Sequence, residues 1–109
     1  LAQSLACTTI VRAREPRGRA LLLHGFMGCR GDMYGLGKYL AVSLDIECIC
    51  VDLLYHGDTA QLGSKHVSTC TEASACVGEL LSEIEHTVRE LARDAPVILA
   101  GYSMGARLA

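Results

Sequence analysis

The sequence predicts an α/β fold of three layers, in which a mostly parallel sheet lies between helices. Three short, largely apolar runs, at residues 20–23, 46–53 and 97–100, alternate with longer segments whose apolar residues have helical spacing. Strands that alternate with helices pair in parallel through right-handed crossovers. The last run leads directly into the pattern G-x-S-x-G at residues 101–105, which is typical of a sharp turn from a strand into a helix.

The first third of the chain predicts two strands and a turn. Residues 5–13 contain neighbouring β-branched side chains and favour a strand, whereas the polar stretch 12–19 with Pro16 favours a turn. The run 20–23 is continuously apolar, as in strands covered by helices on both faces. The glycine-containing loop HGFMG follows it at 24–28 and continues to residue 32.

The remaining elements follow from periodicity. Apolar residues at helical spacing predict a helix over 33–43, although two internal glycines weaken it. The apolar run that follows predicts a second buried strand over 46–53. A polar loop covers 58–68, and the sequence T-x-x-E at 69–72 fits a capping box. The helix expected over 70–93 is the most regular, and residues 97–100 form the third buried strand.

Composition narrows the function classes. The net charge is −2 without a basic stripe, so nucleic acid is not expected as a partner, and no run is long enough to span a membrane. Six cysteines without a C-x-x-C pair predict reduced thiols rather than disulfides or a metal site. They are Cys7, Cys29, Cys48, Cys50, Cys70 and Cys76.

The G-x-S-x-G pattern predicts a reactive serine. In such a turn Ser103 takes a strained, positive-φ conformation, which the flanking glycines permit, and a helix starts directly behind it. The N–H of Met104 and the N–H of Phe26, in the loop after the earlier strand, would form an oxyanion hole. The alternative is a glycine-rich turn with an inert serine.

Residues 20–109 resemble the α/β-hydrolase fold family. The segment HGFMG at 24–28 resembles the oxyanion loop of that family, DLLYHG at 52–57 its D-x-P-G-H-G segment, and GYSMGARLA at 101–109 its nucleophile elbow. More narrowly, HGFMG together with GYSMGARLA is similar to the SHCHC synthases of menaquinone and phylloquinone biosynthesis. The chain departs from the family at Leu54 and Tyr55, where Pro-Gly is usual, and at Met33, near a common tryptophan.

The resemblance implies a lyase that eliminates pyruvate from an enolpyruvyl precursor, with Ser103 as the base or proton relay. Phe26 and Met104 would steady the negative charge through their N–H groups, and no metal or organic cofactor would be needed. Arg107 lies one helical turn after the serine, and would hold a carboxylate of a small-molecule substrate. The other interpretation of Arg107 is an ordinary structural ion pair. His24 is expected to shape its loop rather than act as the base.

The resemblance also implies that residues 1–109 are the N-terminal part of a domain, cut after the elbow. The catalytic acid, the histidine and the cap would lie beyond Ala109, so the fragment alone is expected to be inactive and poorly soluble. An ester or thioester hydrolase and an inactive remnant stay open as alternatives. An intracellular location, cytoplasm or chloroplast, and a place within a larger multifunctional chain are also expected.

Overall fold

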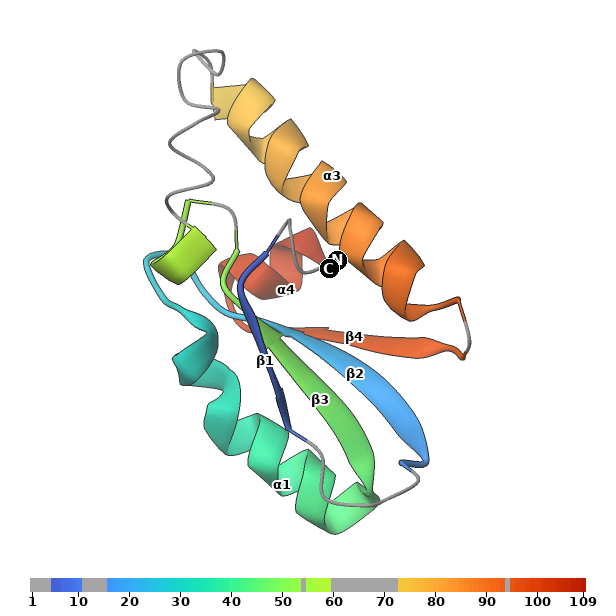
Figure 1. Ribbon diagram of the computed structural model, residues 1–109. Helices are drawn as coiled ribbons and strands as arrows, with labels where there is room; N and C mark the ends of the chain where they lie inside the picture. The colour runs from blue at the N-terminus through green and yellow to red at the C-terminus, as the bar shows by residue number, and fades with distance from the viewer. Residues whose placement is uncertain (1–4, 11–15, 54, 60–72, 94) are drawn as a thin grey trace.

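The computed structural model describes residues 5–10, 16–53, 55–59, 73–93 and 95–109, with the side chains of α3 described from residue 77 onward (Figure 1). The elements in chain order are β1 (Cys7–Ile10), β2 (Gly18–Leu23), η1 (Arg30–Met33), α1 (Tyr34–Leu44), β3 (Ile46–Val51), η2 (Gly57–Thr59), α3 (Ala73–Leu91), β4 (Val97–Gly101) and α4 (Met104–Leu108). The expected capping box at 69–72, residues 12–15 of the polar turn expected over 12–19, and residues 60–68 of the polar loop expected over 58–68 lie outside the described residues.

Four strands form one sheet in the order β1-β3-β2-β4. The pairs β2–β3 and β2–β4 are parallel, with Leu21 opposite both Ile49 and Leu99, so the mostly parallel sheet is confirmed. Strand β1 is antiparallel to β3. Only residues 11–17 separate β1 from β2, which is too short for the crossover that a parallel arrangement needs.

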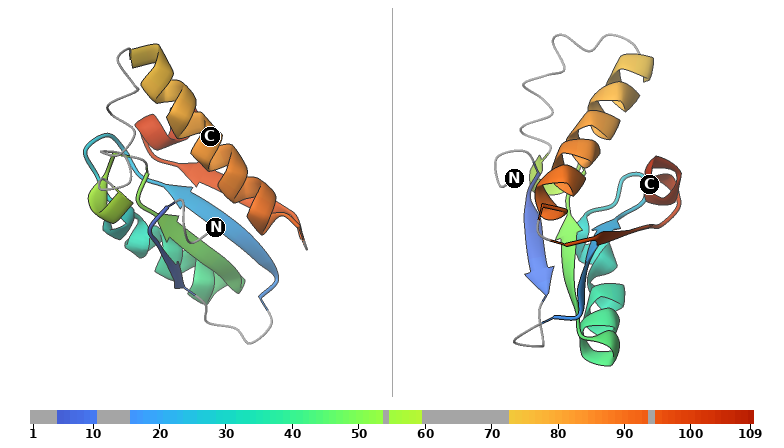
Figure 2. Two further views of the ribbon diagram at one scale, coloured as in Figure 1. Left: turned by 45° about the horizontal axis from the view of Figure 1, so that its top comes forward. Right: turned by 90° about the vertical axis from the view of Figure 1, so that its right-hand side faces the viewer.

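The sheet is covered on both faces, which confirms the three layers (Figure 2). Side chains alternate across β2: Leu21 and Leu23 enter one core cluster, whereas Ala20 and Leu22 enter the other. The first cluster includes Leu80, Ile84 and Leu91 of α3, with Met104 and Leu108 of α4 packed against it. The second is covered by Met33, Tyr34 and Leu40 of η1 and α1.

Two expectations about local structure were wrong. Residues 30–33 form the short helix η1 rather than a loop, because the Asp32 carboxylate accepts the Cys29 N–H at 3.1 Å and the Asp32 N–H bonds back to the Cys29 carbonyl at 3.0 Å. The run 97–100 is only partly buried, with Ile98 53% exposed. Strand β4 lies at the sheet edge in the described part of the chain, and α1 packs mainly on β3 and β1, so the face that carries Ile98 is left open there.

A glycine in α1 allows close packing of the helix on the sheet. Gly37 is buried, and a Cβ built on it would lie 2.8 Å from Cδ1 of Ile10 and 3.4 Å from Sγ of Cys50. The glycine that weakens the helix in isolation therefore lets α1 approach β1 and β3. Burial raises the pKa of the Cys50 thiol to about 11, and the four cysteines with described side chains are free thiols.

Candidate functional site

The site predicted from G-x-S-x-G lies between β4 and α4, where the backbone turns sharply at Ser103. Ser103 has φ 53° and ψ −114°, the positive φ expected there, which is strained for a residue with a Cβ. The Tyr102 N–H donates to the Leu23 carbonyl at 3.0 Å, and the Gly105 N–H donates to the Tyr102 carbonyl at 2.9 Å. These bonds fix both sides of the serine, whose side chain is exposed.

Two glycines make this turn sterically possible. A Cβ built on Gly105 would overlap the carbonyl oxygens of Leu23 and His24, and one built on Gly101 would overlap the Gly105 backbone. Helix α4 therefore approaches the end of β2 more closely than any side chain would allow. The first helical residue is Met104, and its N–H has no acceptor within the helix because it belongs to the first turn.

The loop after β2 lies against the serine turn. A Cβ built on Gly25 would lie 3.5 Å from Ser103 Cβ and 3.3 Å from Tyr102 Cδ1, so the two segments are in near contact. Within the described residues, the N–H of Phe26 donates to no backbone carbonyl. The fold thus brings the serine turn, with Ser103 and Met104, next to the Gly25–Phe26 segment, although the two segments are far apart in the sequence.

His24 anchors the start of this loop. The residue is fully buried, its Nδ1–H donates to the Gly25 carbonyl at 2.7 Å, and its Nε2 accepts the Leu53 N–H at 3.0 Å. Burial lowers the pKa of His24, since the charged ring would lose its hydration. Both ring nitrogens are engaged in these bonds, so in this arrangement His24 offers no free lone pair to Ser103, and its contacts join the loop to the segment after β3.

An ionic network anchors the far end of the loop. The backbone N–H of Arg30 donates to Asp52 Oδ1 at 2.7 Å. The guanidinium of Arg30 pairs with Asp52 Oδ2 and also with Asp58 Oδ2, the latter at 2.9 Å. The guanidinium also donates to Thr8 Oγ1 at 3.0 Å. Asp52 is 1% exposed. These contacts join the segment after β2 to the segment after β3.

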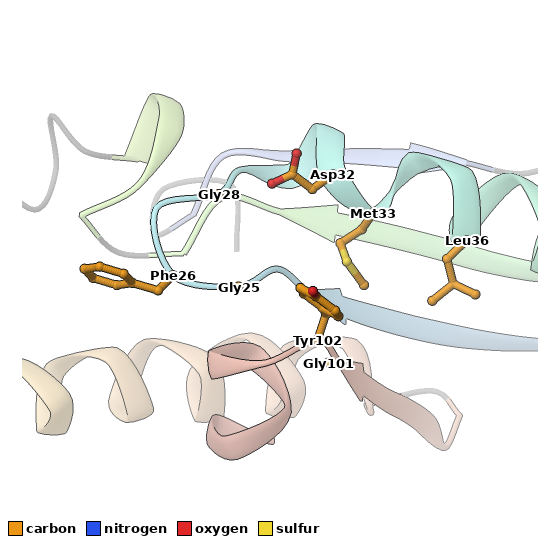
Figure 3. A pocket seen from close by; sticks show the side chains of 8 residues that line it. All are labelled: Gly25, Phe26, Gly28, Asp32, Met33, Leu36, Gly101 and Tyr102. Carbon is orange, nitrogen blue, oxygen red and sulfur yellow. The ribbon is translucent and has the colours of Figure 1, made fainter.

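A cavity of about 460 Å³ opens beside the serine turn and is lined mostly by apolar groups (Figure 3). Met33 and Leu36 point from η1 and α1 toward the end of β4, where Tyr102 stands, and Phe26 lies on the outer side. The carboxylate in the lining, Asp32, is already used in capping η1. The cavity therefore suits an apolar group placed against Gly101 and Tyr102, the two residues that precede Ser103.

Arg107 lies one turn after Ser103 in α4, and its backbone N–H donates to the Ser103 carbonyl at 3.2 Å. Its side chain is exposed. Among the described residues the ion pairs are formed by other arginines, and Arg107 takes part in none of them. Within the described ranges Arg107 is thus an arginine without an ion pair, one helical turn after the serine.

Comparison with known proteins decides the family. Residues 21–109 match the family model for the alpha/beta hydrolase fold. The chain belongs to this family. It is also similar to Protein PHYLLO, chloroplastic, of Arabidopsis thaliana, with 31% identity over 90 residues that cover 83% of this chain. The chain spans 5% of the length of that relative.

The departure at Tyr55 has a conformational consequence in this α/β hydrolase. Tyr55 has φ 71°, a left-handed conformation that glycine adopts without strain, and it stands where the family usually has glycine. Its hydroxyl donates to Glu79 Oε2 at 2.6 Å, and this bond raises the pKa of Tyr55 to about 12. The tyrosine is therefore held in place by a contact with α3.

The anchoring network of Arg30, Asp52 and Asp58 could not be predicted from local sequence patterns. Asp52 carried a signal, since a carboxylate at the end of a buried strand needs partners, but nothing in the sequence pointed to Arg30, which is 22 residues away. Among the described residues, no group of three or more His, Cys, Asp and Glu side chains could hold a metal ion. None of the described helices has the length and apolar character needed to cross a bilayer.

Proposed function

We propose that this chain carries the serine and the oxyanion donors of a lyase similar to SHCHC synthase, which eliminates pyruvate from an enolpyruvyl substrate. The observation that supports it most is the strained turn at Ser103, packed against the Gly25–Phe26 segment. Family membership and the similarity to PHYLLO agree with it. The strain at Ser103 suits a functional serine, because strained residues cluster at active sites.

In the proposed reaction Ser103 acts on a ring proton of the substrate. A histidine and an acidic residue outside residues 1–109 would activate its hydroxyl, since His24 has both nitrogens occupied. The histidine takes the hydroxyl proton, and the resulting Ser103 alkoxide takes the ring proton. The electron pair of the broken C–H bond then forms a ring double bond as the bond between the ring carbon and the enolpyruvyl oxygen breaks. Pyruvate leaves as its enolate and is protonated by the histidinium.

The N–H groups of Phe26 and Met104 would stabilise the negative charge that develops in this step. The Phe26 N–H donates to no backbone carbonyl among the described residues. The Met104 N–H lies in the first turn of α4, where no carbonyl of the helix can accept it. A donor of this kind contributes about 3 kcal/mol to transition-state stabilisation. Arg107, unpaired within the described ranges, would hold a substrate carboxylate through two parallel hydrogen bonds.

The second candidate is a carboxylic-ester or thioester hydrolase, in which Ser103 attacks the carbonyl carbon. It is supported by the same turn and the same donors, and by the apolar cavity of about 460 Å³, which suits an acyl group. The exposed Arg107 favours the lyase, because a carboxylate-bearing substrate would use it. A non-catalytic remnant is the third possibility, and it predicts no serine-dependent activity.

The chemistry would take place in the chloroplast, within a longer multifunctional protein that contains this chain. The chloroplastic relative, of which the chain spans 5%, supports both proposals. Immunolocalisation with an antibody against the described region would test the first. Mass-spectrometric sizing of the protein that the antibody captures would test the second.

An assay of the intact protein that contains this chain separates the three candidates. Pyruvate release from the enolpyruvyl substrate and hydrolysis of an aryl ester are measured for the natural protein, for Ser103→Ala and for Ser82→Ala, an exposed serine of α3. The lyase predicts pyruvate release that falls by about 10³-fold or more in Ser103→Ala alone. Serine-dependent ester hydrolysis without pyruvate release supports the hydrolase, and the absence of both activities supports the remnant.

Arg107 is tested with two substitutions in the same assay. Arg107→Gln should raise KM for the carboxylate substrate by about tenfold or more, since two charged hydrogen bonds are lost, and Arg107→Lys should recover part of the loss. Arg89→Gln removes another exposed arginine, which is paired with Glu85 on α3, and serves as the control. An unchanged KM in Arg107→Gln would remove this residue from the substrate site.

A further inference from the structure

The segment after β3 holds the loop after β2 through a ring contact. The His56 ring lies 5.0 Å from the His24 ring and 6.1 Å from the Phe26 ring, which it meets edge to face. Phe26 and Met27 are otherwise open to solvent, with 73% and 82% of their surface exposed. The tip of this loop therefore has few contacts, and the His56 ring is one of them.

The backbone around His56 is fixed on both sides. Its own N–H donates to the Leu53 carbonyl at 2.9 Å, and the Asp58 N–H donates to Asp52 Oδ2 at 2.8 Å. Gly57 has φ 51° and lies so close to the Asp52 carboxylate that a Cβ would overlap it. Together these contacts aim the His56 ring toward the loop.

Tyr55, the residue before His56, connects this segment to a helix. Its hydroxyl donates to Glu79 of α3, and its ring packs against the core cluster that also contains α3 residues. The left-handed backbone of Tyr55 is strained, so the residue keeps this conformation only while its surroundings hold it there. If the hydroxyl contact is lost, the strain favours a different backbone angle directly before His56.

We propose that Tyr55 is a positioning residue: its hydrogen bond to Glu79 ties α3 to the His56 ring, which holds the Phe26 loop against the serine turn. The catalytic part of this inference rests on the proposed function, because it is the Phe26 N–H that would face the reacting oxygen. The inference concerns a position at which this chain departs from the usual Pro-Gly of its family. Tyr55 contacts no substrate and acts through His56 and Phe26.

Hydrogen exchange in the intact protein tests the structural part directly. Tyr55→Phe should speed exchange of the Gly28 and Cys29 amides, which are hydrogen-bonded within this loop, by about fivefold or more, because a local contact that limits opening is lost. Glu79→Ala should do the same, whereas Glu79→Gln keeps an acceptor oxygen and should stay near the natural rate. Tyr39→Phe, at an exposed tyrosine of α1, is the matched control.

Turnover tests the catalytic part. Tyr55→Phe and Glu79→Ala should lower kcat by about tenfold with KM changed less than twofold, since a misplaced donor acts on the transition state, and Glu79→Gln should restore kcat. If Tyr55→Phe leaves the exchange rates unchanged, the inference is overturned. It is also overturned if exchange becomes faster while kcat stays unchanged, provided that Ser103→Ala abolishes the activity. If Ser103→Ala keeps full activity, the proposed function fails, and the exchange measurement still decides whether Tyr55 holds the loop.

Discussion

The two segments that meet at the candidate site are held by different kinds of contact. The loop after β2 is fixed by polar bonds at both ends, through His24 to Leu53 and through Arg30 to Asp52. The serine turn after β4 is fixed by close approach of backbones, which Gly105 permits. No side chain of the described residues hydrogen-bonds the Ser103 hydroxyl in that turn.

This difference indicates how each half of the site tolerates change. A polar network has several members, so the loss of one leaves the others in place at a moderate cost. A backbone contact has no room to relax, because neither partner can rotate away from an added methyl group. The serine turn should therefore be the more sensitive half.

The largest effect is expected for Gly105→Ala. The added Cβ would overlap the carbonyl oxygens of Leu23 and His24, and should lower the free energy of unfolding by at least about 3 kcal/mol. Chemical denaturation of the intact protein would measure it. Gly35→Ala is the control, since nothing lies within 4 Å of a Cβ there, and it should stabilise α1 by about 0.5–1 kcal/mol. Equal effects of the two substitutions would contradict the steric account.

A smaller effect is expected for Asp52→Asn in the polar half. The amide keeps the shape but loses the charge that faces Arg30, so the free energy of unfolding should fall by about 2 kcal/mol. Asp58→Asn removes the exposed carboxylate of the same network, at 75% side-chain exposure, and should cost less than about 1 kcal/mol. If Asp58→Asn costs as much as Asp52→Asn, burial is not what makes Asp52 important.

The smallest effect is a pH dependence that comes from His24. Because burial lowers its pKa below the ordinary 6.5, the unfolded chain takes up the proton first. The stability that neutral His24 provides is complete above pH 6.5 and declines as the pH falls below it. Urea denaturation between pH 7.5 and 5.5 should show this decline, and His24→Gln should flatten it. His86→Gln, at an exposed histidine of α3, is the control; a decline lost in both variants would refute the assignment.

The layered fold could be predicted because apolar runs and helical periodicity are local signals. Residues 20–23 are buried as their composition requires, and the helix around residue 84 follows its pattern. The exposure of Ile98 could not be predicted from its apolar neighbours, because burial of a strand depends on its place in the sheet. The helix η1 was missed because its cap is a cysteine with a later aspartate, a weak signal.

The serine turn could also be predicted, since a G-x-S-x-G pattern specifies a steric requirement within five residues. The anchors of the facing loop could not, because Arg30 and Asp52 meet only after the sheet has formed. The same holds for Tyr55 and Glu79, 24 residues apart. Contacts of this range leave no periodic trace in a single sequence.

The central claim is that the N–H groups of Phe26 and Met104 converge on the substrate oxygen that gains negative charge beside Ser103. The most direct test is NMR of the intact protein with phenylboronic acid, which forms a negatively charged tetrahedral adduct on an active serine. The account predicts downfield shifts of the Phe26 and Met104 amide protons in the adduct, and no shift in Ser103→Ala. An adduct on Ser103 that leaves the Phe26 amide unshifted would contradict it.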